Sequence, residues 1–212
     1  MRPFMASFVL AGAVGLGAVS PLGQIVAADT ATPVHLRGEV QSVNGQSFQL
    51  ASPGGAVAVD WNDQTRISSL EPAQVKDITF GMFVGTAAVP QPDGTLKALE
   101  VHIFPESMRG SGEGYRPFPQ VPQGTMTNAT VSNIVGTEGA VSDNGLTLTL
   151  TYKDGQKTVS VPKGTPVVEI GPGDASMIQP HAKVSVTGTK DSSGKLTASR
   201  IQVGLDGVTP PL

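Results

Sequence analysis

The chain contains one segment twice, since residues 40–104 and 140–204 align without a gap at an offset of 100. Turn-forming glycines and intervening apolar residues recur at the same places in both copies. The identical pairs include Gly45/Gly145, Leu50/Leu150, Val59/Val159, Pro72/Pro172, Val84/Val184, Gly94/Gly194 and Ala98/Ala198. Shared glycines set where the backbone turns, and shared apolar residues set which side chains face a core. The repeat therefore predicts that the two copies have the same fold.

Each copy reads as a series of short strands joined by tight turns. Residues 146–152 alternate between apolar and polar side chains, and Asn44-Gly45 and Asp93-Gly94 are typical of hairpin turns. Short helical turns are expected near residues 69–77 and 174–178. Small antiparallel sheets of this kind close on themselves to hide their edges. We therefore predict an all-β chain with a barrel over residues 34–104, a second barrel over residues 129–205, and a tail over 206–212.

The end of each copy also carries a family resemblance. The first copy has FGMFVG at 80–85 and GTLKALEV at 94–101, and the second has PHAKVSV at 180–186 and GKLTASRI at 194–201. With these segments the chain resembles uncharacterised bacterial secreted proteins built from repeated OB-like domains of unknown function. The resemblance implies two tandem OB-like antiparallel β-barrels. Similar proteins are sometimes labelled metal ABC transporter permeases, but a permease needs several apolar spans and this chain has at most one.

The first 28 residues are typical of a secretory signal peptide. Arg2 precedes an apolar stretch over residues 4–19, and Ala27-Ala28 offers small residues at a cleavage site. An uncleaved membrane anchor is the alternative, although the stretch is short for a spanning helix. Cleavage would leave a periplasmic or secreted protein without a membrane span. The chain has no Cys, which excludes disulfides, thiolate metal sites and cysteine nucleophiles.

Net charge and motifs limit the functions that this chain can have. The formal net charge is −3, and without a basic cluster the chain is a poor candidate for binding nucleic acid. It has no GxSxG nucleophile turn and no phosphate-binding glycine loop with its lysine. A hydrolase is therefore the least favoured class, and we expect no enzymatic activity.

The segment between the copies, residues 105–128, has no strand-like alternation. It is rich in Pro and Gly and also carries Arg109, Tyr115, Arg116 and Phe118. A flexible tether would not carry these side chains, so we expect an ordered strap that lies along a barrel. In one interpretation the strap is structural, with its arginines paired to carboxylates. In the other it offers Arg and aromatic groups to a ligand or partner.

One aromatic residue outside the strap is a further candidate contact. Phe83 lies on a predicted strand, and its counterpart in the second copy is Lys183. A lysine at the matching position predicts an exposed site. Phe83 is therefore expected to join the strap residues in contacting a ligand.

A metal site is the second functional hypothesis. Glu100 and His102 lie two apart on a predicted strand and share one face. With Glu106 or His35 they could hold Zn or Cu, which accept carboxylate and imidazole ligands. The leading hypothesis is a non-enzymatic module that binds a small ligand or an envelope protein and needs no cofactor. A periplasmic Zn- or Cu-handling accessory protein is the alternative.

Overall fold

The computed structural model describes residues 32–136 and 145–211, which form a nearly all-β protein. The predicted signal peptide lies outside the described residues. Within these two ranges no helix is long and apolar enough to cross a bilayer. The all-β class predicted from the sequence is therefore confirmed.

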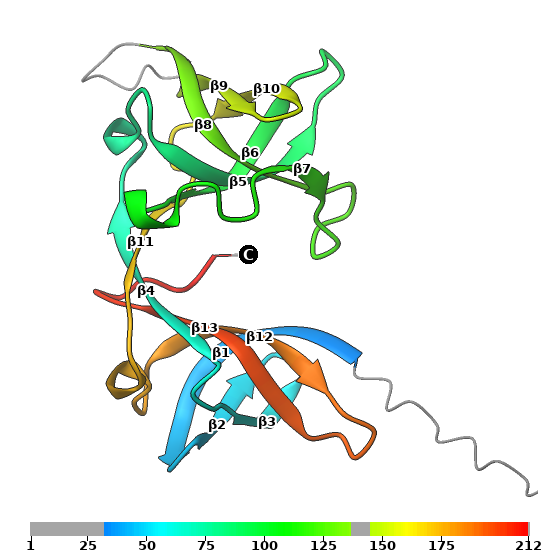
Figure 1. The fold of residues 1–212 in the computed structure, drawn as a ribbon, viewed down its shortest axis with the longest axis vertical. Coiled ribbons are helices and arrows are strands. Elements are labelled where there is room, and N and C mark those ends of the chain that lie inside the picture. The colour runs from blue at the N-terminus through cyan, green and yellow to red at the C-terminus, as the bar shows by residue number, and fades with distance from the viewer. Residues whose placement is uncertain (1–31, 137–144, 212) are drawn as a thin grey trace, which may run out of the picture.

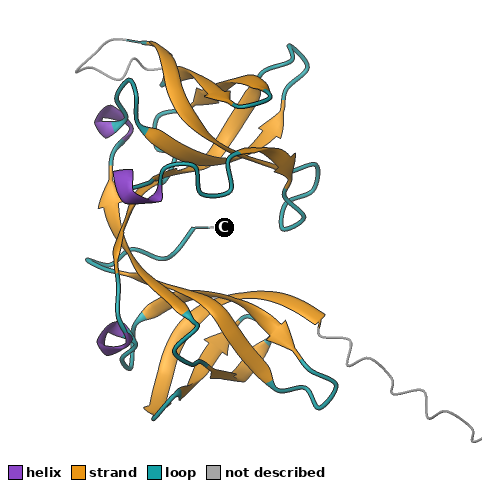
Figure 2. Cartoon of the chain, in the orientation of Figure 1, coloured by secondary structure: helices purple, strands orange, loops and turns teal. Residues whose placement is uncertain are grey.

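Thirteen strands and three short 3-10 helices make up the described chain (Figure 2). The strands of the first half are β1 (Thr32–Asn44), β2 (Ser47–Ser52), β3 (Gly55–Asp60), β4 (Arg66–Ala73), β5 (Phe83–Pro90) and β6 (Leu96–Ile103). Those that follow are β7 (Gly114–Pro117), β8 (Thr125–Val135), β9 (Leu146–Tyr152), β10 (Gly155–Val161), β11 (Val167–Pro172), β12 (Lys183–Lys190) and β13 (Leu196–Gly204). The helices are η1 (Val75–Asp77), η2 (Glu106–Met108) and η3 (Ala175–Met177).

The strands close into two five-stranded barrels, one above the other in Figure 1. The first barrel has the cyclic order β1-β2-β3-β13-β12, and the second has the order β8-β9-β10-β6-β5. In each barrel one parallel pair, β3 with β13 or β10 with β6, completes the ring. The two barrels share one topology, as the repeat predicts, and closure leaves neither with an open edge.

The predicted assignment of one barrel to each repeat is wrong. The first barrel takes its first three strands from copy one and its last two from copy two, and the second barrel takes the complementary strands. The second barrel also begins earlier than predicted, because β8 starts at Thr125, so the strap ends at residue 124 rather than 128. We call this arrangement the half exchange. Its physical origin is the extended path of β4 and β11, each of which leaves one barrel and enters the other (Figure 1).

The two crossing strands pair with each other at the waist of the molecule. β4 and β11 are antiparallel, and Leu70 is the register partner of Ile170, its own counterpart in the repeat. An approximate twofold axis therefore passes through this pair. Leu70, Val168 and Ile170 are buried there, and Phe104, Met108 and Val208 pack against them. The C-terminal segment thus helps to hold the two barrels together.

Each barrel has its own core, built from equivalent positions of the two copies. In the first barrel Phe48, Leu50 and Val184 are among the buried residues, and in the second Leu148, Leu150 and Val84 take the matching places. The predicted inward faces are thereby confirmed. Trp61 is half-buried and packs against the first core.

The predicted hairpin turns are present, with one shift in register. The turn between β5 and β6 contains Gly94 at φ +83°, as Asp93-Gly94 predicts. Between β1 and β2 the turn residues are Gly45 and Gln46, because Asn44 pairs with Ser47 as the last residue of β1. Gly45 has φ +59°, a conformation that glycine adopts at little cost.

The half exchange predicts which engineered cysteines will meet. Glu39 on β1 is the register partner of Lys183 on β12, whereas a barrel made from one repeat would place it opposite Phe83. Register partners have Cα atoms about 4.5–5.5 Å apart, within disulfide range. We expect the Glu39→Cys/Lys183→Cys variant to form an intramolecular disulfide, detected by peptide mass mapping. Efficient bridging of Glu39→Cys to Phe83→Cys instead would contradict the half exchange.

Candidate functional site

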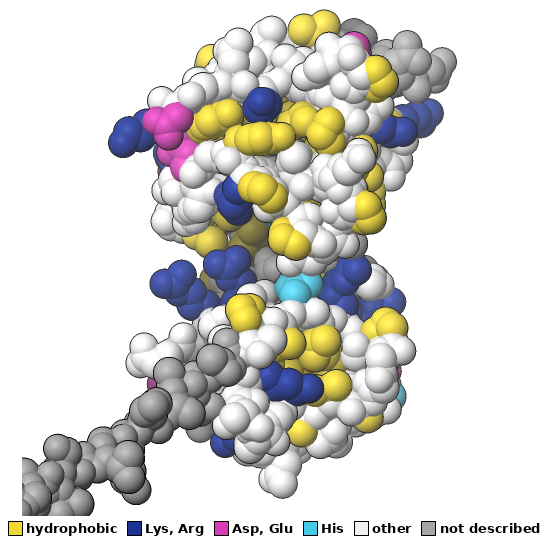
Figure 3. Space-filling view, turned by 90° about the vertical axis from the view of Figure 1, so that its right-hand side faces the viewer, with side chains coloured by type: hydrophobic (Ala, Val, Ile, Leu, Met, Phe, Trp, Pro, Cys, Tyr) yellow, Lys and Arg dark blue, Asp and Glu magenta, His cyan; other side chains and the backbone are white. Residues whose placement is uncertain are grey.

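A cleft of about 760 Å³ lies between the two barrels and is lined by both of them and by the strap. Its volume is in the range of small-molecule sites. Figure 3 shows Lys and Arg side chains on both sides of a histidine where the two lobes meet. The residues that line the cleft include His35, Arg66, Thr187, Arg200 and Gln202 of the first barrel and its crossing strand, His102, Met126 and Asn128 of the second, and Met108, Ser111, Arg116 and Phe118 of the strap.

The wall contributed by the first barrel is a row of polar side chains at one register level. Arg66 on β4 pairs with Arg200 on β13, which pairs with Thr187 on β12, which pairs with His35 on β1. Register partners present their side chains on one face of a sheet, so the row faces the cleft as a unit. His35 Nδ1 lies 3.1 Å from Thr187 Oγ1. Burial, and secondly the charge of Arg37, lowers the pKa of His35.

On the opposite wall His102 of β6 lines the cleft, and the covered Glu100 lies beside it without reaching the lining. Glu100 and His102 share one face of that strand, with His102 Nε2 3.5 Å from Glu100 Oε1. The Glu100 side chain is 2% exposed and that of His102 is 13% exposed. Burial, together with the charge of Arg200, lowers the pKa of His102 to about 4. The imidazole is therefore neutral at neutral pH.

The comparison with protein families identifies the repeated unit. Residues 37–102 and 137–202 each match the model of a Domain of unknown function (DUF5666). The chain belongs to this family. Both matches keep the offset of 100, so the DUF5666 unit is the repeat seen in the sequence, and the resemblance to proteins with repeated domains of unknown function is confirmed. No curated protein matches the chain, and no solved structure matches it.

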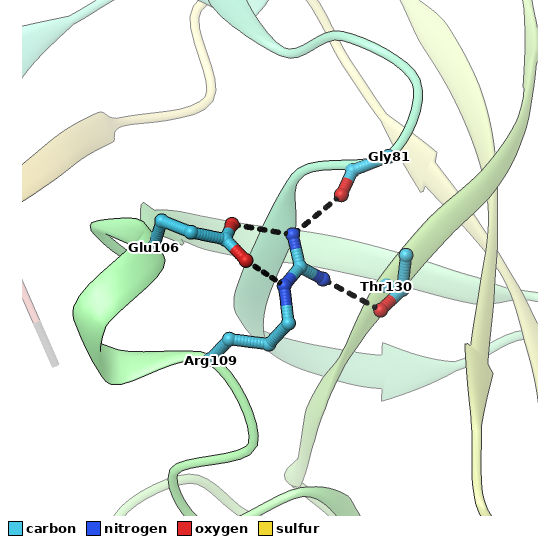
Figure 4. A network of polar contacts seen from close by, with 4 residues as sticks. All are labelled: Gly81, Glu106, Arg109 and Thr130. Atoms are coloured by element: carbon cyan, nitrogen blue, oxygen red, sulfur yellow. Dashed lines mark hydrogen bonds and ion pairs between the residues drawn. The ribbon is translucent and has the colours of Figure 1, made fainter.

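Arg109, which lies between the two family matches, has a structural role. Its Nε and Nη2 donate to the two carboxylate oxygens of Glu106 at 2.5 and 2.7 Å, and Nη2 also donates to Gly81 O at 2.9 Å (Figure 4). Nη1 donates to Thr130 Oγ1 at 3.1 Å. The bonds to Gly81 and Thr130 fasten η2 to the second barrel, and the bonds from Arg109 lower the pKa of the Glu106 carboxyl. For Arg109 the structural interpretation of the strap therefore holds.

The other predicted contact residues divide between two places. Arg116 and Phe118 line the cleft, and Arg116 donates from Nη1 to Gly112 O at 2.7 Å. Tyr115 is 39% exposed, lies outside the cleft lining, and has Lys157 Nζ 4.3 Å from its ring centroid. The predicted exposure of Phe83 is wrong, because Phe83 is only 2% exposed and its ring packs edge-on against Phe104.

The candidate metal ligands are brought together only in part. Glu100 and His102 are neighbours, as their spacing predicts, but the Glu106 carboxylate is bound to Arg109. His35 lies on the other barrel and lines the same cleft as His102. In residues 32–136 and 145–211 no three His, Asp or Glu side chains are grouped as metal ligands.

Sequence reasoning missed the two arginines of the first wall. Arg66 and Arg200 are far apart in the sequence and come from different copies, so only the half exchange places them side by side. The sequence does contain one indication of these residues, because neither arginine is repeated in the other copy. The counterpart of Arg66 is Pro166, and the counterpart of Arg200 is Glu100. A residue that differs between copies is free of the demands of the shared scaffold.

The depressed pKa of His102 predicts a pH-dependent stability. An unfolded histidine titrates near 6.5, so between about pH 6.5 and about pH 4 the unfolded chain binds a proton that the folded chain does not. The free energy of unfolding therefore falls by about 3 kcal/mol from this group as the pH drops through that window. His102→Gln, which inserts the residue found at position 202, should remove this part of the loss.

Urea unfolding of both proteins at about pH 7 and about pH 4 measures this effect. The difference between wild type and variant cancels the other titrating groups. An equal loss of stability in the two proteins would show that His102 is not kept neutral by burial.

Proposed function

We propose that this DUF5666 chain is a non-enzymatic binding module that takes a small ligand into the cleft between its barrels. The observation that supports this most is a cleft of about 760 Å³ with contributions from both barrels and from Arg116 and Phe118 of the strap. Sites between two structural units, with apolar walls and a few convergent polar groups, are typical of small-molecule binding. Phe118, Met108 and Ile170 supply apolar surface, and the arginines and histidines supply polar contacts.

The cleft chemistry favours binding over catalysis. Thr187 and His35 form a hydroxyl–imidazole contact of 3.1 Å, the first part of a nucleophile–base pair. Activation also needs a third group that orients the imidazole through its other nitrogen. His35 Nε2 is buried without a hydrogen-bond partner among the described residues. We therefore assign Thr187 and His35 to the binding surface.

The proposed site of action is outside the cytoplasm, in the periplasm or the medium. This part of the proposal is supported by residues 1–28, with a basic start, an apolar stretch and small residues before Asp29. A cleft that is built by chain pairing alone suits a protein without cysteine, because its shape does not depend on disulfides.

A matched pair of substitutions tests the cleft as the ligand site. Thr187 is exposed and lines the cleft, so Thr187→Trp should fill the cleft without disturbing a core. Thr189→Trp makes the same change on the same strand at an exposed position outside the lining. After incubation with the small-molecule fraction of an envelope extract, wild type and Thr189→Trp should retain one compound, detected by mass spectrometry. Thr187→Trp should not.

Two results would contradict the binding-module proposal. Equal retention by both variants would place the ligand elsewhere. A wild-type protein that retains nothing above a buffer-only control would argue against a small ligand.

A metal-handling role is the second candidate, favoured by the 3.5 Å approach of His102 to Glu100. Their side chains could supply one imidazole and one carboxylate ligand. If this role is real, the purified mature protein should carry a stoichiometric amount of Zn or Cu in elemental analysis, and His102→Ala should lose it. Metal-free protein whose melting temperature does not respond to either ion would remove the candidate.

A further inference from the structure

Three guanidinium groups converge on the cleft from different parts of the chain. Arg66 and Arg200 are register partners on neighbouring parallel strands, and Arg116 comes from β7 of the strap. Burial, and secondly the charge of Arg200, lowers the pKa of Arg116. The same charge contributes to the low pKa of His102 on the facing barrel. Arg200 thus lies close enough to both groups for their charges to interact.

Among the described residues, the lining of the cleft carries no acidic side chain that matches this positive charge. In the part of the chain that the structure describes, none of the three guanidinium groups forms an ion pair with a carboxylate. No Asp or Glu is among the described residues that line the cleft. Arg109 shows the contrast, because Glu106 neutralises it. Like charges on facing strand positions destabilise a sheet, and a cleft with low-dielectric walls concentrates their field.

The fold itself does not require arginine at these positions. The counterpart of Arg200 in the other copy is Glu100, and the counterpart of Arg66 is Pro166. Both copies nevertheless build equivalent barrels around matching core residues. The arginines are therefore additions to a scaffold that folds without them, and their cost in mutual repulsion calls for a compensating anion.

We infer that the ligand of the cleft is a compact polyanion, a small molecule with at least two carboxylate or phosphate groups. This inference rests on the proposed binding function and deepens it. Guanidinium groups bind carboxylate and phosphate oxygens through paired, charge-assisted hydrogen bonds. Arg66 and Arg200 hold one anionic group from the first barrel, and Arg116 holds a second from the strap. The less polar part of the ligand packs against Phe118 and Met108.

Calorimetric titration of the protein from Asp29 to its C-terminus, at low ionic strength, tests the inference. Citrate tests whether the ligand carries carboxylates, and inorganic pyrophosphate tests whether it carries phosphates. Triethyl citrate is the uncharged control for citrate. We expect at least one of the two anions to bind, and triethyl citrate not to bind. Raising the salt concentration should weaken binding, because the arginines are exposed to solvent.

Single substitutions locate the anion site. Arg66→Gln, Arg116→Gln and Arg200→Gln should each weaken binding about tenfold or more, the effect of losing one charge-assisted contact. Arg200→Glu, which copies position 100, should abolish binding. Lys195→Gln is the matched control, because Lys195 is paired with Asp60 away from the cleft and its loss also removes one positive charge. The control should bind as wild type does.

Three outcomes of the titrations would overturn the inference, and two further results reject it as well. The first three are an equal loss of affinity in Lys195→Gln, equal binding of triethyl citrate, and no binding of either anion by folded wild-type protein. The compound that wild type retains from the extract could be uncharged and absent from the Thr187→Trp variant. That result would support the binding module and show that the ligand is not a polyanion. Binding of a long acidic polymer with neither small anion would also reject it.

Discussion

The antiparallel pairing of β4 with β11 determines how the rest of the molecule is assembled. Each of these strands runs straight from one barrel into the other, and they meet at Leu70 and Ile170. Because neither strand turns back, the first three strands of each repeat must find their last two partners in the other repeat. The barrels are thereby joined by two continuous strands and a shared apolar cluster, with the cleft between them.

Sequence patterns could predict the strands and their inward faces because those properties are local. Leu148 and Leu150 alternate with threonines, and both are fully buried. The identity of the partner strand could not be predicted in the same way. Val84 and Val184 are identical and occupy equivalent cores, so a strand of copy one fits either partner equally well. The choice lies in the path of the connecting segment, which carries no distinct pattern of its own.

The site residues that lie together in one segment of the sequence could be predicted. The mixture of Arg and aromatic residues in the strap correctly indicated an ordered element, and Arg116 and Phe118 do line the cleft. Composition alone could not separate Arg116 from Arg109. The distinguishing feature is Glu106, three residues before Arg109, which places an acid within reach of that guanidinium on a helical turn. For Phe83 the lysine at position 183 was misleading, because Phe104 and the Arg109 side chain cover the ring only in the second barrel.

Duplication and divergence together explain why one cleft can have two unlike walls. A strictly repeated chain with this half exchange would place the same residues on both sides of the approximate twofold axis at Leu70 and Ile170. Here the first barrel presents Arg200 where the second has Glu100, and Gln202 where the second has His102. The strap adds a further asymmetry, because it joins the two copies once and pairs with a strand of the second barrel. Core positions cannot diverge in this way without loss of packing. Cleft positions can, so the differences between the copies mark the part of this fold that is available for binding.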